Sequence, residues 1–299
     1  MNWVSSYRGN IMLNDIYVSR KLKEVEEFEE GIDKRLKKLD KAIDERIGKF
    51  NVMDFIPKGM VADFGTGIGT DLISLSKLCN DAELVGVDIT SKGLKVAKDL
   101  LSKEKKEFHL VRADAVFPPF RNNMFDAVNF SNILHHHPFS LLERIFGEVD
   151  RISKRNSLVL IAEPSYLNES YEFSMEIDRI SDGVRDLQKL SSVYNLKDLR
   201  KIRYYLHVFG YYGNVCPSTL KRVLENYGFK ITKTRVVAEG EGTNEVTDKL
   251  KKDIASLSLD ESAREYLAES LEDLKKKYSM INPLYEFTLY LKAVKTNAR

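Results

Sequence analysis

The N-terminal region, about residues 15–50, carries apolar residues at steps of three and four among charged ones. This spacing places the apolar side chains in one stripe along a helix, and the mixed lysines and glutamates of the polar face support the same structure. If continuous, the helix would be about 50 Å long at about 1.5 Å per residue. We expect a surface helix packed on the body of the protein. A helix that pairs with a second copy in a homodimer is the alternative, and Gly31 in its middle favours the first interpretation. The stripe consists of Val18, Leu22, Val25, Phe28, Ile32, Leu36, Leu39, Ile43, Ile47 and Phe50.

From Pro57 onwards, short β-prone apolar runs alternate with helical patterns. This alternation is typical of βαβ units and predicts an α/β fold with a doubly wound, mostly parallel sheet. The expected strands are 60–64, 82–88, 107–112, 125–130 and 157–162, and the expected helices between them include 70–78, 93–101 and 141–152.

The pattern changes again after Pro164. About fifty residues, 165–215, are rich in Tyr and Phe, and they predict either the core of a helical cap or a wall for an apolar acceptor. A helix at 217–227, a strand at 229–238, a charged helical stretch at 240–280 and a final strand at 285–294 follow. We therefore expect an N-terminal helical extension, 1–50, and one domain, 51–299, with insertions at about 165–215 and 240–283.

Composition narrows the class of protein. The 299 residues are 43% hydrophobic and 31% charged, which is typical of a folded globular chain. The net charge of +2 argues against a nucleic-acid partner held by bulk electrostatics. With no apolar run of the roughly 20 residues that a bilayer requires, and only Cys79 and Cys216, we expect a cytoplasmic protein without membrane contact.

The segment Val61–Thr70, VADFGTGIGT, carries the strongest chemical signal. A strand runs into Gly65, Gly67 and Gly69 and a helix follows, which is where doubly wound folds bind nucleotide-like ligands. The dinucleotide-binding fingerprint G-x-G-x-x-G would require a glycine at position 70, where this chain has Thr70. Asp63, before the first glycine, would repel a pyrophosphate and suits a cationic amino group, reached directly or through water. The pattern favours a ligand with an ammonium group and no phosphate.

Two further acids end the next two strands. Asp88 follows Gly69 by nineteen residues, a distance at which a carboxylate can accept hydrogen bonds from ribose hydroxyls. Asp114 ends the third strand and could accept a hydrogen bond from the amino group of a base. Because the carboxyl ends of parallel strands share one edge of the sheet, three acids there predict one binding site.

These motifs resemble those of the class I S-adenosylmethionine-dependent methyltransferases, small-molecule branch. VADFGTGIGT is similar to the first motif of that family, VGVDIT to its second-strand motif, and SLVLIAEP to its fifth strand. The resemblance implies a seven-stranded Rossmann-like sheet of order 3-2-1-4-5-7-6 with an antiparallel last strand. One departure is Lys154–Ser157, where the family often has Pro-Gly-Gly. The cofactor-binding residues that the resemblance implies are Asp63, Gly65, Gly67, Gly69, Asp88, Ile89, Asp114, Ala115 and Ser131.

Three consecutive histidines, His135, His136 and His137, follow the fourth strand. Consecutive side chains rarely reach one ion, and no further ligand stands at a suitable spacing, so we expect no metal. His136 matches the more recurrent family position and is the candidate general base, although an imidazole that only packs beside the cofactor is the alternative.

The expected function is methyl transfer from S-adenosylmethionine to a small-molecule acceptor in a capped pocket, with S-adenosylhomocysteine as product. Methylation of RNA or protein and a non-catalytic cofactor-binding scaffold are the alternatives. Since a ligand at the strand ends needs cover, we also expect residues 15–50 and 165–215 to close over it.

Overall fold

The computed structural model describes residues 21–22, 24–78, 81–104, 106–137, 139–165, 180, 217–238, 243–256, 259, 261–278 and 287–296. The aromatic segment that we expect to cap the site therefore lies almost entirely outside the described residues.

Seven strands form one sheet in the order β3-β2-β1-β4-β5-β7-β6, as the sequence predicts. β1 to β5 pair in parallel, and β7 runs antiparallel to both β5 and β6. The strands are β1 (Met60–Phe64), β2 (Glu83–Asp88), β3 (Phe108–Arg112), β4 (Phe125–Ser131), β5 (Ser153–Ser165), β6 (Phe229–Ala238) and β7 (Phe287–Lys295).

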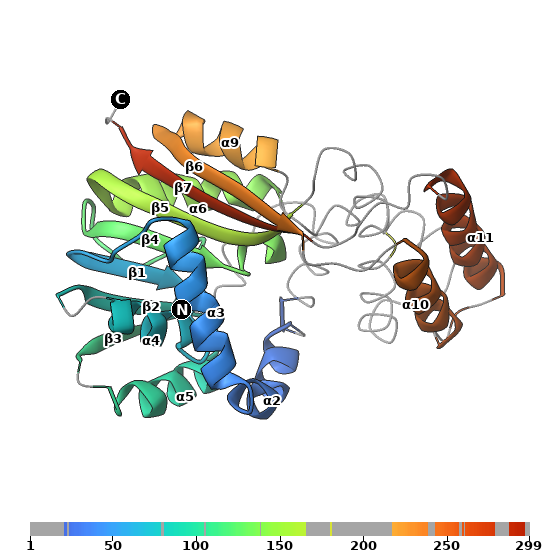
Figure 1. Cartoon of the computed structure of the whole chain (residues 1–299), viewed down its shortest axis with the longest axis horizontal. Coiled ribbons are helices and arrows are strands. Elements are labelled where there is room, and N and C mark those ends of the chain that lie inside the picture. The colour runs from blue at the N-terminus through green and yellow to red at the C-terminus, as the bar shows by residue number, and fades with distance from the viewer. Residues whose placement is uncertain are drawn as a thin grey trace.

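Helices cover both faces of the sheet (Figure 1). On one face, Phe50 and Leu72 pack with Val61 and Leu84 of the sheet; on the other, Phe146 packs with Phe130. The first face carries α3 (Leu39–Val52), α4 (Thr70–Leu78) and α5 (Ser91–Leu101), and the second carries α6 (Phe139–Ile152) and α9 (Pro217–Asn226). Alternate strand residues face opposite layers, so the sheet has a core on each side.

The N-terminal helix is interrupted. Residues 24–30 are helical, a turn follows at Gly31, and α2 (Ile32–Leu36) ends two residues before α3 begins. The apolar stripe is thus divided among short helices that follow the curved surface of the body, with Ile32, Ile43 and Phe50 buried. From Ile32 onwards the stripe packs on the protein's own core, whereas Leu22 is exposed and Val18 lies outside the described residues. A continuous helix of about 50 Å does not form.

The turn before the main part of β5 departs from the resembling family without disturbing the sheet. Asn156 adopts a φ of 61°, a left-handed conformation that asparagine tolerates better than most residues. The pairing with β4 shifts register between Phe125 and Ala127 and continues to Ser131. Asn156 thus provides the left-handed backbone conformation that a glycine would provide in this turn.

The charged stretch between β6 and β7 contains α10 (Thr243–Ser256) and α11 (Glu261–Tyr278), which lie side by side at one end of the molecule (Figure 1). Leu250 and Leu271 are buried, and Lys251 pairs with Glu272 at 2.7 Å. Among the helices in the described ranges, none has both the length and the apolar composition needed to cross a membrane.

Candidate active site

The glycine loop between β1 and α4 is held against the end of β2. Gly65, Gly67 and Gly69 all have positive φ, at 74°, 53° and 87°, which explains the three glycines. The Gly65 N–H donates to the Val87 carbonyl at 2.8 Å, and the Gly67 N–H donates to Asp88 Oδ2 at 2.7 Å. The loop is therefore a rigid, narrow turn at the carboxyl edge of the sheet.

Both carboxylate oxygens of Asp88 already accept hydrogen bonds from the protein. Its Oδ1 accepts hydrogen bonds from the Thr90 N–H at 2.7 Å and the Thr90 hydroxyl at 2.6 Å, while Oδ2 accepts from Gly67. A carboxylate has about four lone-pair sites, so these bonds leave one on Oδ2. One ribose hydroxyl can bind in this geometry, and a second requires the Thr90 hydroxyl to turn away.

The remaining predicted cofactor residues lie at neighbouring strand ends. Asp114 follows β3, and its Oδ1 accepts from the Val116 N–H at 2.9 Å. Ala115 is buried beside it, and Ile89 is half-buried just after Asp88. Ser131 ends β4. The sheet thus brings Asp63, Asp88, Asp114 and Ser131 to one edge, and their contacts with a cofactor stay a prediction.

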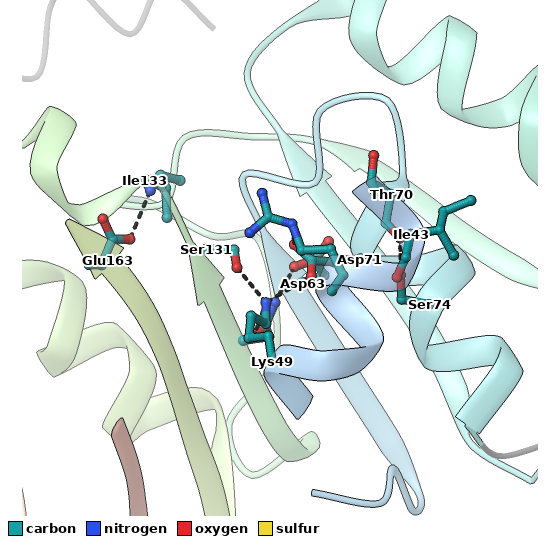
Figure 2. Close-up of polar contacts among 11 residues, drawn as sticks. Ile43, Lys49, Asp63, Thr70, Asp71, Ser74, Ser131, Ile133 and Glu163 are labelled. Atoms are coloured by element: carbon teal, nitrogen blue, oxygen red, sulfur yellow. Dashed lines mark hydrogen bonds and ion pairs between the residues drawn. The ribbon is translucent and has the colours of Figure 1, made fainter. Parts of the chain in front are cut away.

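A buried polar cluster lies directly beneath the loop (Figure 2). Lys49, from α3, donates to Asp71 Oδ1 at 2.8 Å, to Ser131 Oγ, and to Asn129 Oδ1 at 3.4 Å. Asn129 in turn donates to Asp63 Oδ1 at 2.7 Å. Asp63 Oδ2 and Thr66 Oγ1 are both buried, and the Thr66 hydroxyl acts as a hydrogen-bond partner that lowers the pKa of Asp63. Beyond this hydroxyl, Oδ2 has room in its hydrogen-bonding capacity for a further donor such as a water or a ligand cation.

The cations of this cluster lie nearer to one carboxylate than to the other, since both Lys49 and Arg46 pair with Asp71. Burial raises the pKa of Asp63 to about 7, the Asp71 carboxylate adds to the rise, and Lys49 and Asn129 oppose it. Burial also acts to raise the pKa of Asp71, but Lys49 and Arg46 outweigh it and hold that pKa below its usual range. Lys49 and Asp71 therefore form the ion pair, and Asp63 carries the labile proton.

Residues 24–30 of the N-terminal helix lie on the glycine loop. A Cβ built on Gly67 would stand 2.8 Å from Phe28 Cζ, and one on Gly93 would stand 3.0 Å from Phe28 Cε1. The Lys92 N–H donates to Glu29 Oε1 at 3.1 Å, and Lys92 Nζ donates to the Glu29 carbonyl at 2.9 Å. This part of the helix is therefore placed as a cover for the loop.

His135 and His136 lie in a short 3₁₀ turn, η2 (Leu134–His136), after the end of β4, and His137 follows it. His136 Nδ1 lies 3.5 Å from Glu24 Oε1 of the N-terminal helix, and burial lowers the pKa of His136 to about 4. His137 is buried, and its Nδ1 lies 3.1 Å from the Ile133 carbonyl. The role of His136 as a general base stays a prediction. Within the described residues no group of three or more acidic, histidine or cysteine side chains could hold a metal.

The carboxylate of Glu163, near the end of β5, anchors this turn. Oε1 accepts the Ile133 N–H at 2.8 Å and the Leu134 N–H at 2.9 Å, while Oε2 lies 2.8 Å from His135 Nδ1. Burial acts to raise the pKa of Glu163, but the bonds from His135, Leu134 and Ile133 hold it below its usual range. Glu163 is thus a buried, ionised acceptor.

Sequence reasoning missed Lys49, Asn129 and Glu163. Glu163 had a signal, since it is a fourth acid near the end of a strand, inside the apolar run SLVLIAEP. Lys49 had none, because in a charged helix nothing local distinguishes one lysine that enters the core from those that face water.

Comparisons with known proteins agree with this architecture. Residues 61–156 match the family model described as a methyltransferase domain. A provisionally assigned methyltransferase from Bacillus halodurans C-125 superposes with a TM-score of 0.56 at 16% identity, covering 83% of this chain and 99% of that one. The YcgJ protein from Bacillus subtilis gives 0.52 at 14% identity, with coverages of 85% and 99%. The [4+2]-cyclase SpnF gives 0.52 at 15%, with coverages of 86% and 81%. No curated protein matches in sequence.

The sheet order and the glycine loop are those of the Rossmann-like methyltransferase fold, and residues 61–156 match the methyltransferase domain within it. The match to a methyltransferase domain supports S-adenosylmethionine as the cofactor and S-adenosylhomocysteine as the product.

Proposed function

We propose that this protein transfers a methyl group from S-adenosylmethionine to a small-molecule acceptor. The observation that carries the proposal is the buried carboxyl of Asp63 beside the glycine loop, whose Oδ2 keeps hydrogen-bonding capacity that suits the ammonium group of the cofactor's amino-acid end. The oxygen is closed off from bulk solvent, so the contact runs through an ordered water or forms as the N-terminal helix shifts. Asp88 and Asp114 lie at the same edge for the ribose and the base, with Ile89, Ala115 and Ser131 nearby.

Methyl transfer does not require the protein to form a covalent bond with either reactant. The methyl carbon of a sulfonium donor is already electrophilic, so the rate depends mainly on in-line placement and the exclusion of water. A rigid loop, a buried charge cluster and a helix that covers the loop meet these needs. The near-neutral charge supports a small acceptor over RNA.

Fold alone does not settle the reaction, since one structural neighbour is a [4+2]-cyclase. Calorimetry with S-adenosylhomocysteine and with NAD tests the cofactor first. We expect S-adenosylhomocysteine to bind and NAD not to bind comparably, and equal affinity for NAD would overturn the assignment. Asp99→Asn, at an exposed carboxylate on α5, is the matched control for substitutions of Asp88.

Transfer itself is tested by incubating the protein with a donor that carries an isotopically labelled methyl group and with fractions of a cell extract. We expect mass spectrometry to find the label in the small-molecule fraction. Label in RNA or protein would favour a macromolecular acceptor instead. Cofactor binding without any transfer would favour the scaffold alternative.

A further inference from the structure

His135 and Glu163 form a dyad at the ends of β4 and β5, on the edge of the sheet that carries the glycine loop. His135 Nδ1 lies 2.8 Å from Glu163 Oε2, and the His135 side chain keeps 21% of its surface exposed while that of Glu163 is fully buried. Ile133, two residues earlier, packs over the loop, because a Cβ on Gly65 would stand 2.8 Å from its Cδ1. The dyad therefore lies two residues along the chain from a side chain that packs on the glycine loop.

The hydrogen bonds fix the state of the imidazole. Glu163 is an ionised acceptor that also takes the N–H groups of Ile133 and Leu134. Nδ1 must then donate, so the proton of the neutral ring sits on Nδ1 and Nε2 keeps a free lone pair. A carboxylate that holds an imidazole in this tautomer is the arrangement that prepares histidine as a base.

We infer that His135, rather than His136, is the general base of the reaction, that Glu163 is its positioning residue, and that the acceptor is a protic nucleophile, an O–H or N–H group. This inference rests on the proposed function. The acceptor atom forms a bond to the methyl carbon as the carbon–sulfur bond breaks and its electron pair stays on sulfur. His135 Nε2 takes the acceptor's proton, and the resulting imidazolium faces the Glu163 carboxylate until the proton passes to water. A thioether or a tertiary amine has no proton to lose and would not need this base.

The surroundings explain why the neighbouring histidine is a weaker choice. The ring of His136 lies 4.0 Å from that of His135, between centroids, and its Nδ1 faces Glu24 of the N-terminal helix. Desolvation, His135 and Lys21 all act to lower the pKa of His136, although its side chain keeps 41% of its surface exposed. The charged and titratable groups around the dyad are thus Glu163, His136, Glu24 and Lys21.

Glu163→Gln is the sharpest variant because the backbone dictates its orientation. The amide oxygen must replace Oε1 to accept from Ile133 and Leu134, which leaves the NH₂ group facing His135 Nδ1. Nδ1 then has to accept, and the ring proton moves to Nε2. The turn keeps two of its anchoring bonds while the base is lost.

The first test is ¹⁵N NMR of the full chain labelled at histidine, with His135→Gln identifying the signals. We expect an Nδ1-protonated ring in the wild type and an Nε2-protonated ring in Glu163→Gln. A wild-type ring protonated on Nε2 would overturn the proposal.

The second test measures transfer from S-adenosylmethionine to phenols of graded acidity and to simple amines. We expect His135→Gln and Glu163→Gln to lower kcat by about 10²- to 10⁴-fold with KM nearly unchanged, and the loss to shrink as the phenol becomes more acidic. His109→Gln, at an exposed histidine on β3, is the matched control and should retain full activity.

A loss in His136→Gln alone, or a loss independent of phenol acidity, would overturn the dyad. Unchanged calorimetric binding of S-adenosylhomocysteine in both variants separates the two proposals. If the wild type itself binds no S-adenosylhomocysteine, the proposed function fails. The assignment of His135 as the base then fails as well, even if NMR finds its ring protonated on Nδ1.

Discussion

The Asp63 carboxyl should couple cofactor binding to the release of a proton. Its pKa is raised to about 7 in the ligand-free protein, mainly by burial, so near neutral pH the group is partly protonated. The ammonium group of a bound cofactor favours the carboxylate form. Affinity for S-adenosylhomocysteine should therefore be highest above about pH 7 and fall as the pH decreases.

The magnitude follows from the titration. With a pKa of about 7, the carboxylate form makes up about three quarters of the protein at about pH 7.5 and about one part in thirty at about pH 5.5. If the ligand binds only that form, the affinity falls about 25-fold across this range, or about 1.9 kcal/mol. The pKa of His136, about 4, lies below this pH range.

Isothermal titration calorimetry in buffers of different ionisation enthalpy measures both quantities. We expect a release of about half a proton per ligand at about pH 7, with the affinities following the curve above. Asp63→Asn is the control: its binding should be weak and nearly independent of pH. Equal affinities at the two ends of the range, or the same pH dependence in Asp63→Asn, would refute the coupling.

Asp63→Asn should also stabilise the ligand-free protein. The folded pKa of Asp63 is raised above its ordinary 3.8, so its proton favours the folded state at low pH, and this contribution is lost as the pH rises from about 4 to about 7. The variant keeps the buried Lys49–Asp71 pair and removes a carboxyl whose ionised form burial disfavours. We expect a higher melting temperature than wild type at about pH 8, and a lower one would contradict the raised pKa of Asp63.

Three further predictions concern the same edge of the sheet. Asp88→Ala should weaken S-adenosylhomocysteine binding by about 1–3 kcal/mol in calorimetry, and unchanged affinity would mean that this acid is misplaced. Lys49→Met should destabilise the fold by about 3–5 kcal/mol in urea unfolding, with part of the loss recovered by adding Asp71→Asn; no recovery would argue against the ion pair. Hydrogen exchange in residues 24–30 should slow when S-adenosylhomocysteine binds, whereas protection confined to the strand ends would leave this helix a purely structural element.

The order of elements and the chemistry of the glycine loop could be predicted from sequence. β1 (Met60–Phe64), α4 (Thr70–Leu78) and β6 (Phe229–Ala238) lie at the predicted residues, because apolar periodicity and glycine spacing are local properties that each segment carries wherever it packs. The common edge of Asp63, Asp88 and Asp114 also follows, since parallel strands place their carboxyl ends together.

The tertiary structure decided what depends on contacts between distant segments. Lys49 meets Asn129 eighty residues away, and Glu163 meets His135 across two neighbouring strands, so no local pattern could reveal either pair. The division of the N-terminal helix likewise follows from the surface on which it packs. These contacts matter because they set the protonation state of each carboxyl group. In water a carboxylate has its usual pKa, whereas burial beside particular partners decides whether the group is ionised, protonated or able to bind a cation.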